Sequence, residues 1–500
     1  MMKKERGLGV LCHISSLPNE FGIGSLGKEA YEFADLLKKA GVKYWQILPL
    51  QQTMYGDSPY MSVCCNSGNP YFIDLVDLQR QGLLDESELE SAKSPCQRVD
   101  YVKVAEKHYE LLIKAYSRFN IRSQAFVDFI NSGEYEDYAL FMSLKNRYGD
   151  SFYNFPDAYK YKEHLAMYEF RNSVYRTDYC FWLFVQYQFN RQWQALKKYV
   201  NGLGIKIIGD IPLYIAYDSS DLWARPELFQ LDEDLKPVKV AGVPPDYFSA
   251  KGQLWGNPLY NWNAAKAENY GWWMARIAKA KEMYDVIRID HFRGFDRYYA
   301  IPADAQDATQ GEWEKGPGKE FFDEIEKRLG KTEIIAEDLG ILDDGVIGLR
   351  DGCNLPGMNI LLFAFDGSDT NSYLPKNIVE NSVTYTGTHD NDTAVGYIKQ
   401  LSQEEYAAFK KRLRASMKEQ GIYEPLVTEQ DVAWALCKSA AYSKSYMVIL
   451  PIQDILGQDN SCRMNIPSTP TGNWQYRLEK MPSRRNMALL KKLIKDSNRA

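Results

Sequence analysis

The sequence predicts an α/β fold, a (β/α)8 TIM barrel with inserted, largely helical subdomains. Eight short runs rich in β-branched and apolar residues are spaced along the 500 residues, and helical patterns lie between most of them. No G-x-G-x-x-G follows the first run, so the alternation favours a closed barrel over an open doubly wound sheet. With 45% hydrophobic and 14% aromatic residues, a chain of this length can bury a large core.

Each predicted strand is an apolar run that ends near a glycine, a proline or a polar residue. The stretches EAYEFADLLKKAG, after the first run, and GKEFFDEIEKRLGK, before the fifth, repeat apolar residues at helical spacing. After the eighth run about 45 residues remain, too few for an ordinary separate domain. The eight runs are 7–15, 43–50, 205–215, 284–290, 332–338, 358–365, 382–390 and 445–454.

Two segments are longer than a normal barrel connection. About 150 residues separate the second and third strands, and most of them carry helical patterns. We therefore expect a largely helical subdomain at about 51–180, followed by a barrel helix that ends near Gly204. The segment at about 217–262 is rich in proline, glycine and aromatic residues. It predicts a long ordered loop over one end of the barrel.

Charge and cysteine usage exclude several classes of protein. The net charge of −6 comes without a block of Lys and Arg, so we expect neither a nucleic-acid partner nor an anionic membrane. No apolar run approaches the length of about 18 residues that a membrane span needs. Eight cysteines lie scattered with no C-x-x-C pair, which is typical of reduced thiols in a cytoplasmic protein.

Four carboxylates stand at the ends of predicted strands, where the active sites of such barrels lie. They are Asp210, Asp290, Glu337 and Asp390. A single carboxylate at such a position is more often a cap or a loop brace. Four like charges at one end of a barrel disfavour folding unless something compensates for them, so their number favours a catalytic origin.

Two neighbouring side chains can support these carboxylates. Arg288 and Asp290 point to the same face of a strand, about 6 to 7 Å apart along it. A guanidinium there favours the ionised form of Asp290, which a nucleophile requires. His389, next to Asp390, can donate a hydrogen bond to a sugar hydroxyl or a carboxylate, although a lone histidine is more often a packed residue.

The histidines leave a metal-dependent barrel hydrolase as an alternative. His13, His291 and His389 each stand near the end of a predicted strand. The five histidines form no H-x-H or H-E-x-x-H pattern, so a ligand set would be mixed and unusually spaced. We therefore expect no metal site.

Paired carboxylates together with many aromatic residues indicate glycoside chemistry. An acetal is cleaved by one acid that protonates the leaving oxygen and one carboxylate that attacks or shields the anomeric carbon. Aromatic rings cover the apolar faces of sugars. Tyr55, Tyr60 and Trp255 lie in loop segments with no apolar periodicity, so they are candidates for sugar contacts.

Motifs along nearly the whole chain resemble those of the 4-α-glucanotransferases called amylomaltases or disproportionating enzymes. These enzymes form glycoside hydrolase family 77 of the α-amylase clan, and the resemblance also supports the count of eight strands. The matching motifs are GDSPY (56–60), GNPYFIDL (68–75), IIGDIPLYIA (207–216), GVPPDYFSAKGQLWGNPLY (242–260), VIRIDHFRGF (286–295), IIAEDLG (334–340), GTHDND (387–392) and RMNIPST (463–469).

The resemblance implies a role for each carboxylate. Asp290 would be the nucleophile, Glu337 the general acid and base, and Asp390 the third carboxylate that stabilises the distorted sugar. It also implies no cofactor, no required metal and no separate C-terminal β domain. The residues expected to assist in binding substrate are Arg288, His389, Asp210, Tyr60, Trp255, Asn257, His291 and Asn465.

The implied reaction is retaining transfer of α-1,4-glucan segments to the 4-hydroxyl of another glucan or of glucose. The implied substrates are maltooligosaccharides, amylose, and fragments of glycogen or starch. A plain retaining α-glucan hydrolase would use the same carboxylates, and a non-catalytic glucan-binding protein would use the same aromatic residues.

Three positions depart from the family pattern. Lys251 stands where Thr is usual, Leu362 where Gln is common and Ser468 where Gly is expected. None is a catalytic position, so they bear on chain-length preference and loop detail.

Overall fold

The computed structural model describes residues 5–54, 56–149, 151–245, 249–340 and 342–500. Its centre is an eight-stranded sheet in which all the pairings are parallel, in the order β10-β11-β12-β1-β2-β3-β6-β9. The strands are β1 (Gly7–Leu11), β2 (Tyr44–Gln46), β3 (Lys206–Ile211), β6 (Val286–Ile289), β9 (Ile334–Ala336), β10 (Gly357–Ile360), β11 (Ser382–Tyr385) and β12 (Met447–Pro451).

The sheet closes between its two outer strands, β9 and β10. The amide of Ala336 donates to the carbonyl oxygen of Pro356 over 3.0 Å. Two residues further along each segment, the amide of Met358 donates to Oδ1 of Asp338 over 2.7 Å. These contacts join the edges of the sheet, and the predicted (β/α)8 barrel is confirmed.

The strands are short, buried runs, as covering on both faces requires. Every residue of β1 and of β12 is buried. Gly9 in β1 is needed for close packing, because a Cβ there would lie 2.8 Å from the carbonyl oxygen of Tyr44 and 2.5 Å from Cδ1 of Ile449. The predicted run at 358–365 is a strand only to Ile360, and a 3-10 helix follows at Leu361–Phe363.

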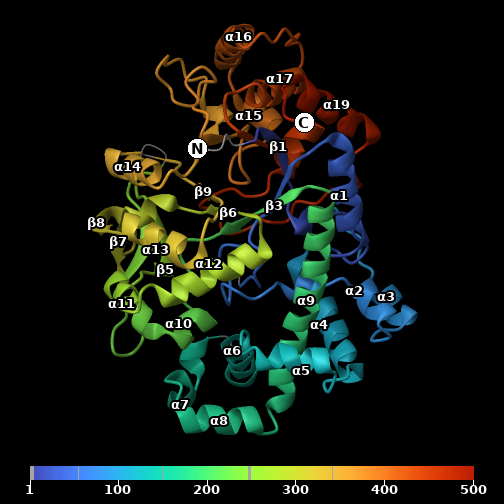
Figure 1. Ribbon diagram of the computed structural model, residues 1–500, viewed down its shortest axis with the longest axis vertical. Coiled ribbons are helices and arrows are strands. Elements are labelled where there is room, and N and C mark those ends of the chain that lie inside the picture. The colour runs from blue at the N-terminus through green and yellow to red at the C-terminus, as the bar shows by residue number, and fades with distance from the viewer. Residues whose placement is uncertain (1–4, 55, 150, 246–248, 341) are drawn as a thin grey trace.

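Helices cover the outside of the barrel (Figure 1). The C-terminal helix α19 packs against α1, so the last helix of the chain lies beside the first barrel helix. The covering helices are α1 (Lys28–Ala40), α12 (Gly271–Met283), α13 (Lys319–Leu329), α14 (Asp344–Gly352), α15 (Ala394–Gln400), α16 (Gln403–Glu419), α17 (Glu429–Ala441) and α19 (Arg484–Asp496).

The chain between β2 and β3 is mainly helical, and most of these helices extend away from the barrel in Figure 1. The long helix α9 packs against α5 and α6 as well as α1 and β3, so it links this region to the barrel. The helices are α2 (Leu75–Arg80), α3 (Glu86–Ala92), α4 (Tyr101–Arg118), α5 (Gln124–Asn131), α6 (Glu136–Tyr148), α7 (Asp157–Lys160), α8 (His164–Asn172) and α9 (Arg176–Gly202).

A second, antiparallel sheet corrects the expectation of a loop at about 217–262. That segment contains helix α10 (Ser220–Ala224) and two strands, β4 and β5, which join two strands that follow β6. The expectation is wrong because β4 pairs not only with the nearby β5 but also with β7, about 60 residues further on, where local composition gives no sign of a partner. The sheet has the order β5 (Gln253–Pro258), β4 (Lys239–Val243), β7 (Arg297–Pro302) and β8 (Glu312–Lys315).

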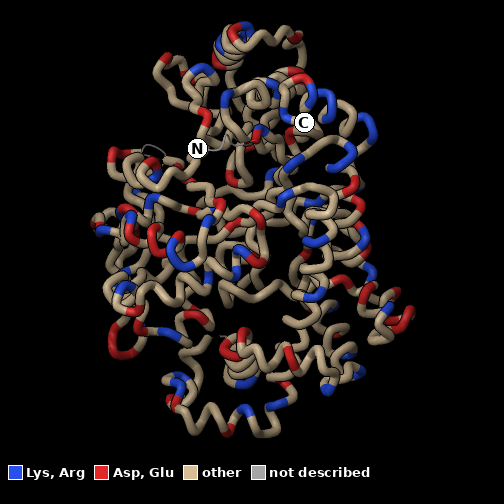
Figure 2. Tube along the Cα trace, in the orientation of Figure 1, with Lys and Arg blue, Asp and Glu red and all other residues tan. Residues whose placement is uncertain are grey.

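Charge is spread along the chain. Figure 2 shows Lys and Arg residues distributed among Asp and Glu residues over the whole trace. Within the residues that the structure describes, no helix is both long and apolar enough to cross a membrane. All eight cysteines are described, and each is a free thiol.

Candidate active site

Strands β3 and β6 bring three charged side chains together at their C-terminal ends. Asp210 and Arg288 are register partners on these neighbouring strands, and Asp290 directly follows β6. Nη1 of Arg288 lies 2.5 Å from Oδ2 of Asp210 and 3.1 Å from Oδ1 of Asp290. The hydroxyl of Tyr60 also donates to Oδ2 of Asp210, over 2.8 Å. Arg288 therefore bridges two carboxylates, and its shorter contact is with Asp210.

Glu337 completes this group from the end of β9. Its Oε2 accepts a hydrogen bond of 2.7 Å from the backbone amide of His291. The backbones are also joined, because the amide of Glu337 donates to Ile289 O and the amide of Phe292 donates to Glu337 O, each over 3.0 Å. His291 has a φ of 50°, in the left-handed region that few non-glycine residues adopt. The turn after β6 thus directs an amide at the Glu337 carboxyl group.

Burial separates the protonation states of the two carboxyl groups. It raises the pKa of Asp290 to about 6, although the charge of Arg288 acts in the opposite direction. Burial and the neighbouring charge of Asp290 raise the pKa of Glu337 to about 8, again against Arg288. The expectation that Arg288 sets the pKa of Asp290 left out desolvation. Near neutral pH, Asp290 is ionised and Glu337 is protonated.

Asp390 reaches the site on a loop rather than on a strand. Strand β11 ends at Tyr385, so the predicted strand at 382–390 is too long. Nε2 of His389 lies 3.3 Å from Oδ2 of Asp390, and Nδ2 of Asn465 donates to Oδ1 over 2.6 Å. Burial disfavours the carboxylate, but the His389 charge and the hydrogen bonds from His389 and Asn465 hold the pKa of Asp390 well below its usual range.

An aromatic stack connects Tyr60, which contacts Asp210, with His389, which contacts Asp390. The ring of Tyr60 stacks on His389 with centroids 5.3 Å apart and planes 15° apart. Trp474 packs against both rings. Its ring centroid lies 5.8 Å from that of Tyr60 and 5.9 Å from that of His389. The sequence interpretation missed Trp474. Its position in a loop without apolar periodicity, shortly after RMNIPST, is the signal that could have found it.

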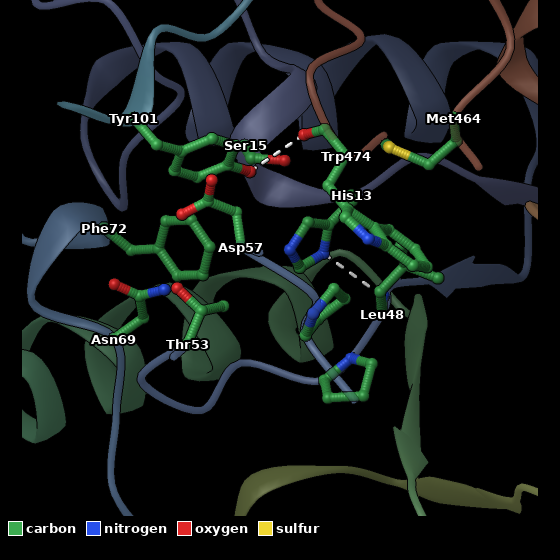
Figure 3. Close-up of a pocket in the computed structure, with 12 residues that line it drawn as sticks. His13, Ser15, Leu48, Thr53, Asp57, Asn69, Phe72, Tyr101, Met464 and Trp474 are labelled. Atoms are coloured by element: carbon green, nitrogen blue, oxygen red, sulfur yellow. Dashed lines mark hydrogen bonds between the residues drawn. The ribbon is translucent and has the colours of Figure 1, made fainter. Parts of the chain in front are cut away.

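Trp474 also lines a small hollow (Figure 3). His13, Asp57, Tyr101 and Trp474 are among its lining residues. Nδ1 of His13 accepts a hydrogen bond of 3.2 Å from the amide of Leu48, and burial lowers the pKa of His13 to about 3. His13 is therefore a neutral, packed residue. Among the residues described, no group of three or more His, Cys, Asp or Glu side chains is arranged to hold a metal ion.

The remaining predicted residues lie near β5. Trp255 packs edge-on against His291, with ring centroids 4.9 Å apart. Nε2 of His291 is buried and has no hydrogen-bond partner within the described part of the chain. Burial and the charge of Arg293 lower the pKa of His291 to about 4, so the ring is neutral. Asn257 is buried and donates from its amide to Ile215 O over 2.8 Å.

Part of the predicted site lies outside the described residues. Tyr55 is one such residue, and so are positions 246–248 of the segment 242–260.

The three residues that depart from the family pattern lie in different structural environments. Ser468 has a φ of 64°, the conformation that glycine adopts most readily. Leu362 is buried in the 3-10 helix after β10. Lys251 is largely exposed and lies 3.7 Å from Asp307.

A parallel (β/α)8 barrel with carboxyl groups gathered at its strand ends is typical of one class of protein, the barrel enzymes that act on glycosidic bonds. A family model described as 4-alpha-glucanotransferase, glycoside hydrolase family 77, matches residues 12–482. The chain belongs to this family, and the predicted resemblance and 4-α-glucanotransferase activity are confirmed.

Relatives and solved structures agree over nearly the full length. The 4-alpha-glucanotransferase of Clostridium butyricum is 42% identical over 473 residues, which cover 93% of this chain and 95% of the relative. That of Thermus thermophilus is 42% identical over 487 residues, with 95% of each covered. The structure of amylomaltase from Streptococcus agalactiae in complex with acarbose has a TM-score of 0.93, at 37% identity, and covers 99% of this chain and 100% of that one.

Proposed function

We propose that this enzyme moves segments of α-1,4-glucan by a retaining double displacement, with Asp290 as nucleophile and Glu337 as general acid and base. The observation that carries this assignment is the placement of the two groups at the ends of neighbouring strands, with Asp290 3.1 Å from Nη1 of Arg288 and Glu337 2.7 Å from the amide of His291. Burial raises the pKa of both groups, that of Glu337 further than that of Asp290. A nucleophile must be ionised and a general acid protonated at the start of the reaction.

In the first displacement Glu337 gives its proton to the glycosidic oxygen while Asp290 attacks C1 of the donor sugar. The C1–O bond to the leaving glucan breaks, and a bond from C1 to the Asp290 carboxylate forms. In the second, ionised Glu337 takes the proton from the 4-hydroxyl of an acceptor, whose oxygen displaces Asp290 from C1. Two inversions retain the α configuration.

Asp390 has a different part in this scheme. It is the third carboxylate, which holds the distorted sugar and stabilises positive charge as it develops at C1. Its low pKa supports this role, since the group stays ionised at all working pH values. Within the same scheme, the buried pair of Arg288 and Asp210 supports the charge distribution, and His389 supports Asp390 and binds substrate.

Several side chains are proposed to contact the glucan directly. Tyr60 and Trp255 offer aromatic faces and Asn465 offers an amide, whereas His291, whose Nε2 is buried, supports the ring of Trp255. For Asn257 we propose a bracing role, because its amide is engaged with the backbone at Ile215. The donors are α-1,4-glucans such as maltooligosaccharides, amylose, and fragments of glycogen or starch, and the acceptors include glucose. The acarbose complex of the Streptococcus agalactiae amylomaltase supports this class of ligand.

Transfer requires that an acceptor sugar outcompete water in the second displacement. A bound and oriented acceptor can reach an effective molarity on the order of 10⁵ M or more, far above that of water at about 55 M. We propose that the aromatic residues of the site, with the segment 242–260, hold the acceptor and exclude water.

The products formed from maltotriose test this proposal. Transfer should give glucose and a ladder of longer maltooligosaccharides with almost no gain in reducing ends, because each bond broken is replaced by a new one. A chelator should change nothing, since no step of the scheme calls for a metal. A rise in reducing ends in proportion to the bonds broken, without longer products, would identify a hydrolase.

We also propose that residues 1–500 act as one catalytic unit carrying insertions at about 51–180 and 217–262. The continuous packing of α9 against both the helical region and the barrel supports this division. The eight free thiols support a cytoplasmic location.

A further inference from the structure

The loop that carries Asp390 is held by a segment that follows the neighbouring parallel strand, β12, at the same end of the barrel. Strand β12 is followed by helix α18 (Ile452–Leu456), and the chain then passes the Asp390 loop at residues 460–465. This stretch, which we term the bracing segment, includes the start of RMNIPST. The sequence interpretation placed Asn465 in the site and gave no role to Arg463.

Arg463 uses all three of its guanidinium nitrogens around Asp390. Nη1 lies 2.5 Å from Oδ1 of Asp392, and Nη2 donates to the backbone carbonyl of Asp390 over 2.6 Å. Nε donates to the backbone carbonyl of Asn465 over 2.7 Å. A planar fork can reach these three acceptors together, whereas the single ammonium group of lysine cannot reproduce that geometry.

These contacts fix both partners of one short hydrogen bond. Arg463 donates to the carbonyl oxygens of both Asp390 and Asn465, and Asn465 donates from Nδ2 to the Asp390 carboxylate over 2.6 Å. The amide of Asn465 also donates to His389 O over 3.1 Å. Arg463 thus sets the distance and angle at which the Asn465 amide meets the carboxylate.

Asp392 forms the outer anchor of this arrangement. Its Oδ1 accepts one hydrogen bond from Nη1 of Arg463 and another, of 2.7 Å, from Nδ2 of Asn460. Asn460 in turn accepts from the amide of Thr393 over 3.1 Å. The side chains of Arg463 and Asp392 are only 16% and 19% exposed, so solvent screens their attraction weakly. The second aspartate of T-H-D-N-D and the arginine of R-M-N therefore act as one unit.

We propose that Arg463 is a positioning residue for the transfer reaction, which orients the Asp390 carboxylate through Asn465 and through the backbone of Asp390. The inference rests on the role of Asp390 in the proposed function. Arg463 does not touch the reacting atoms. Its loss frees the Asp390 loop and misaligns the carboxylate in the transition state, and a displacement of about 1 Å can cost about 100-fold in rate.

Variants of Arg463 test the proposal against a matched control. Arg477 is also buried, and it donates to the backbone carbonyls of Cys96 and Asn19 over 2.9 and 2.8 Å. Arg463→Met should lower kcat for transfer from maltotriose by about 30- to 100-fold with a much smaller change in KM, because alignment is lost mainly in the transition state. Arg463→Lys should recover little of the rate. Arg477→Met should lower the melting temperature without that loss of kcat.

A double variant separates positioning from a general effect on the fold. With a glycosyl fluoride donor, Asp390→Ala and Arg463→Met are each expected to slow turnover, and the double variant should be about as slow as Asp390→Ala alone. If the rate loss of the double variant equals the product of the two single losses, Arg463 acts independently of Asp390 and the inference is overturned. Full recovery of the rate in Arg463→Lys would overturn it as well. A different result, near-normal rate in Asp390→Ala, would remove the role of Asp390 itself and so overturn the proposed function.

Discussion

The active site has two halves that are built in different ways. On the strand-borne half, the parallel ladder sets the positions of Asp210, Arg288, Asp290 and Glu337. On the loop-borne half, Asp390 lies beyond the end of β11 and is held by side chains from a distant part of the chain. Backbone pairing fixes the first half, and side-chain hydrogen bonds fix the second.

The two halves also shift the pKa values of their carboxyl groups in opposite directions. Burial dominates on the strand-borne half and raises the pKa values of Asp290 and Glu337, even with Arg288 beside them. On the loop-borne half, the charge and hydrogen bonds of His389 and the amide of Asn465 outweigh burial and lower the pKa of Asp390. Of the three carboxyl groups assigned to the reaction, Glu337 thereby carries a proton near neutral pH, whereas Asp290 and Asp390 do not.

The largest expected effect comes from exchanging the carboxyl groups of the strand-borne half for amides. Asp290→Asn should lower turnover by about 10⁴-fold or more, because the covalent intermediate cannot form. Glu337→Gln should still form a glycosyl-enzyme from a glycosyl fluoride, since a good leaving group needs no acid. Mass spectrometry of the trapped protein distinguishes the two. An adduct on the Asp290 variant would assign the nucleophile to another residue.

Removing the cation of the strand-borne half should have the next largest effect. Arg288→Met should lower activity by about two orders of magnitude, because Asp210 and Asp290 lose the charge between them. The measurement is kcat at neutral pH, together with the melting temperature.

Arg276→Met is the control for this variant. Arg276 is a buried arginine that donates to the backbone carbonyls of Pro212 and Leu213 over 2.6 and 3.2 Å. Its replacement should reduce stability with little loss of rate per folded molecule. Near-normal turnover of Arg288→Met would contradict the support we assign to Arg288.

The pH dependence of kcat/KM should follow the strand-borne half alone. Activity should rise as Asp290 loses its proton near pH 6 and fall as Glu337 loses its proton near pH 8. On each limb, kcat/KM should change by about tenfold per pH unit. The two apparent pKa values belong to Asp290 and Glu337 as a coupled pair. Arg288→Met should move the acidic limb to higher pH, because Arg288 lowers the pKa of Asp290. An acidic limb that moved to lower pH would show that Arg288 does not favour the ionised form.

The sequence predicted the strand-borne half because parallel strands buried on both faces are continuous apolar runs. Once eight such runs are ordered, Asp210, Asp290 and Glu337 must meet at one end of the barrel. The upward shift of the Asp290 pKa could not be predicted, because desolvation depends on packing from all sides. The resemblance to the family supplied Asn465, which no periodic pattern indicates.

The missed parts depend on contacts between distant segments. Strands β4 and β5 contain glycine and proline, and β4 pairs with β7, about 60 residues further on, so no local pattern identifies the second sheet. The contacts of the Arg463 side chain reach the backbone of Asp390 and the side chain of Asp392 across more than 70 positions. Side-chain hydrogen bonds of this kind leave no periodicity to detect.

Tyr60 is the residue that joins the two halves, and its two contacts can be separated. Its hydroxyl donates to Asp210 on the strand-borne half, and its ring stacks on His389 on the loop-borne half. Phenylalanine keeps the ring and removes the hydroxyl, whereas alanine removes both.

Tyr60→Phe should give the smallest effect, a loss of about tenfold or less in kcat/KM, because one hydrogen bond contributes about 0.5–1.5 kcal/mol net and Arg288 still pairs with Asp210. Tyr60→Ala should be slower again, since His389 loses its stacking partner and the Asp390 carboxylate loses a fixed donor. Kinetics of both variants on maltotriose, with product analysis, provide the comparison. If the hydroxyl alone joined the halves, the two variants would be equally slow. Equal rates would therefore show that the stack with His389 makes no contribution, and that the loop-borne half is held by the bracing segment without help from Tyr60.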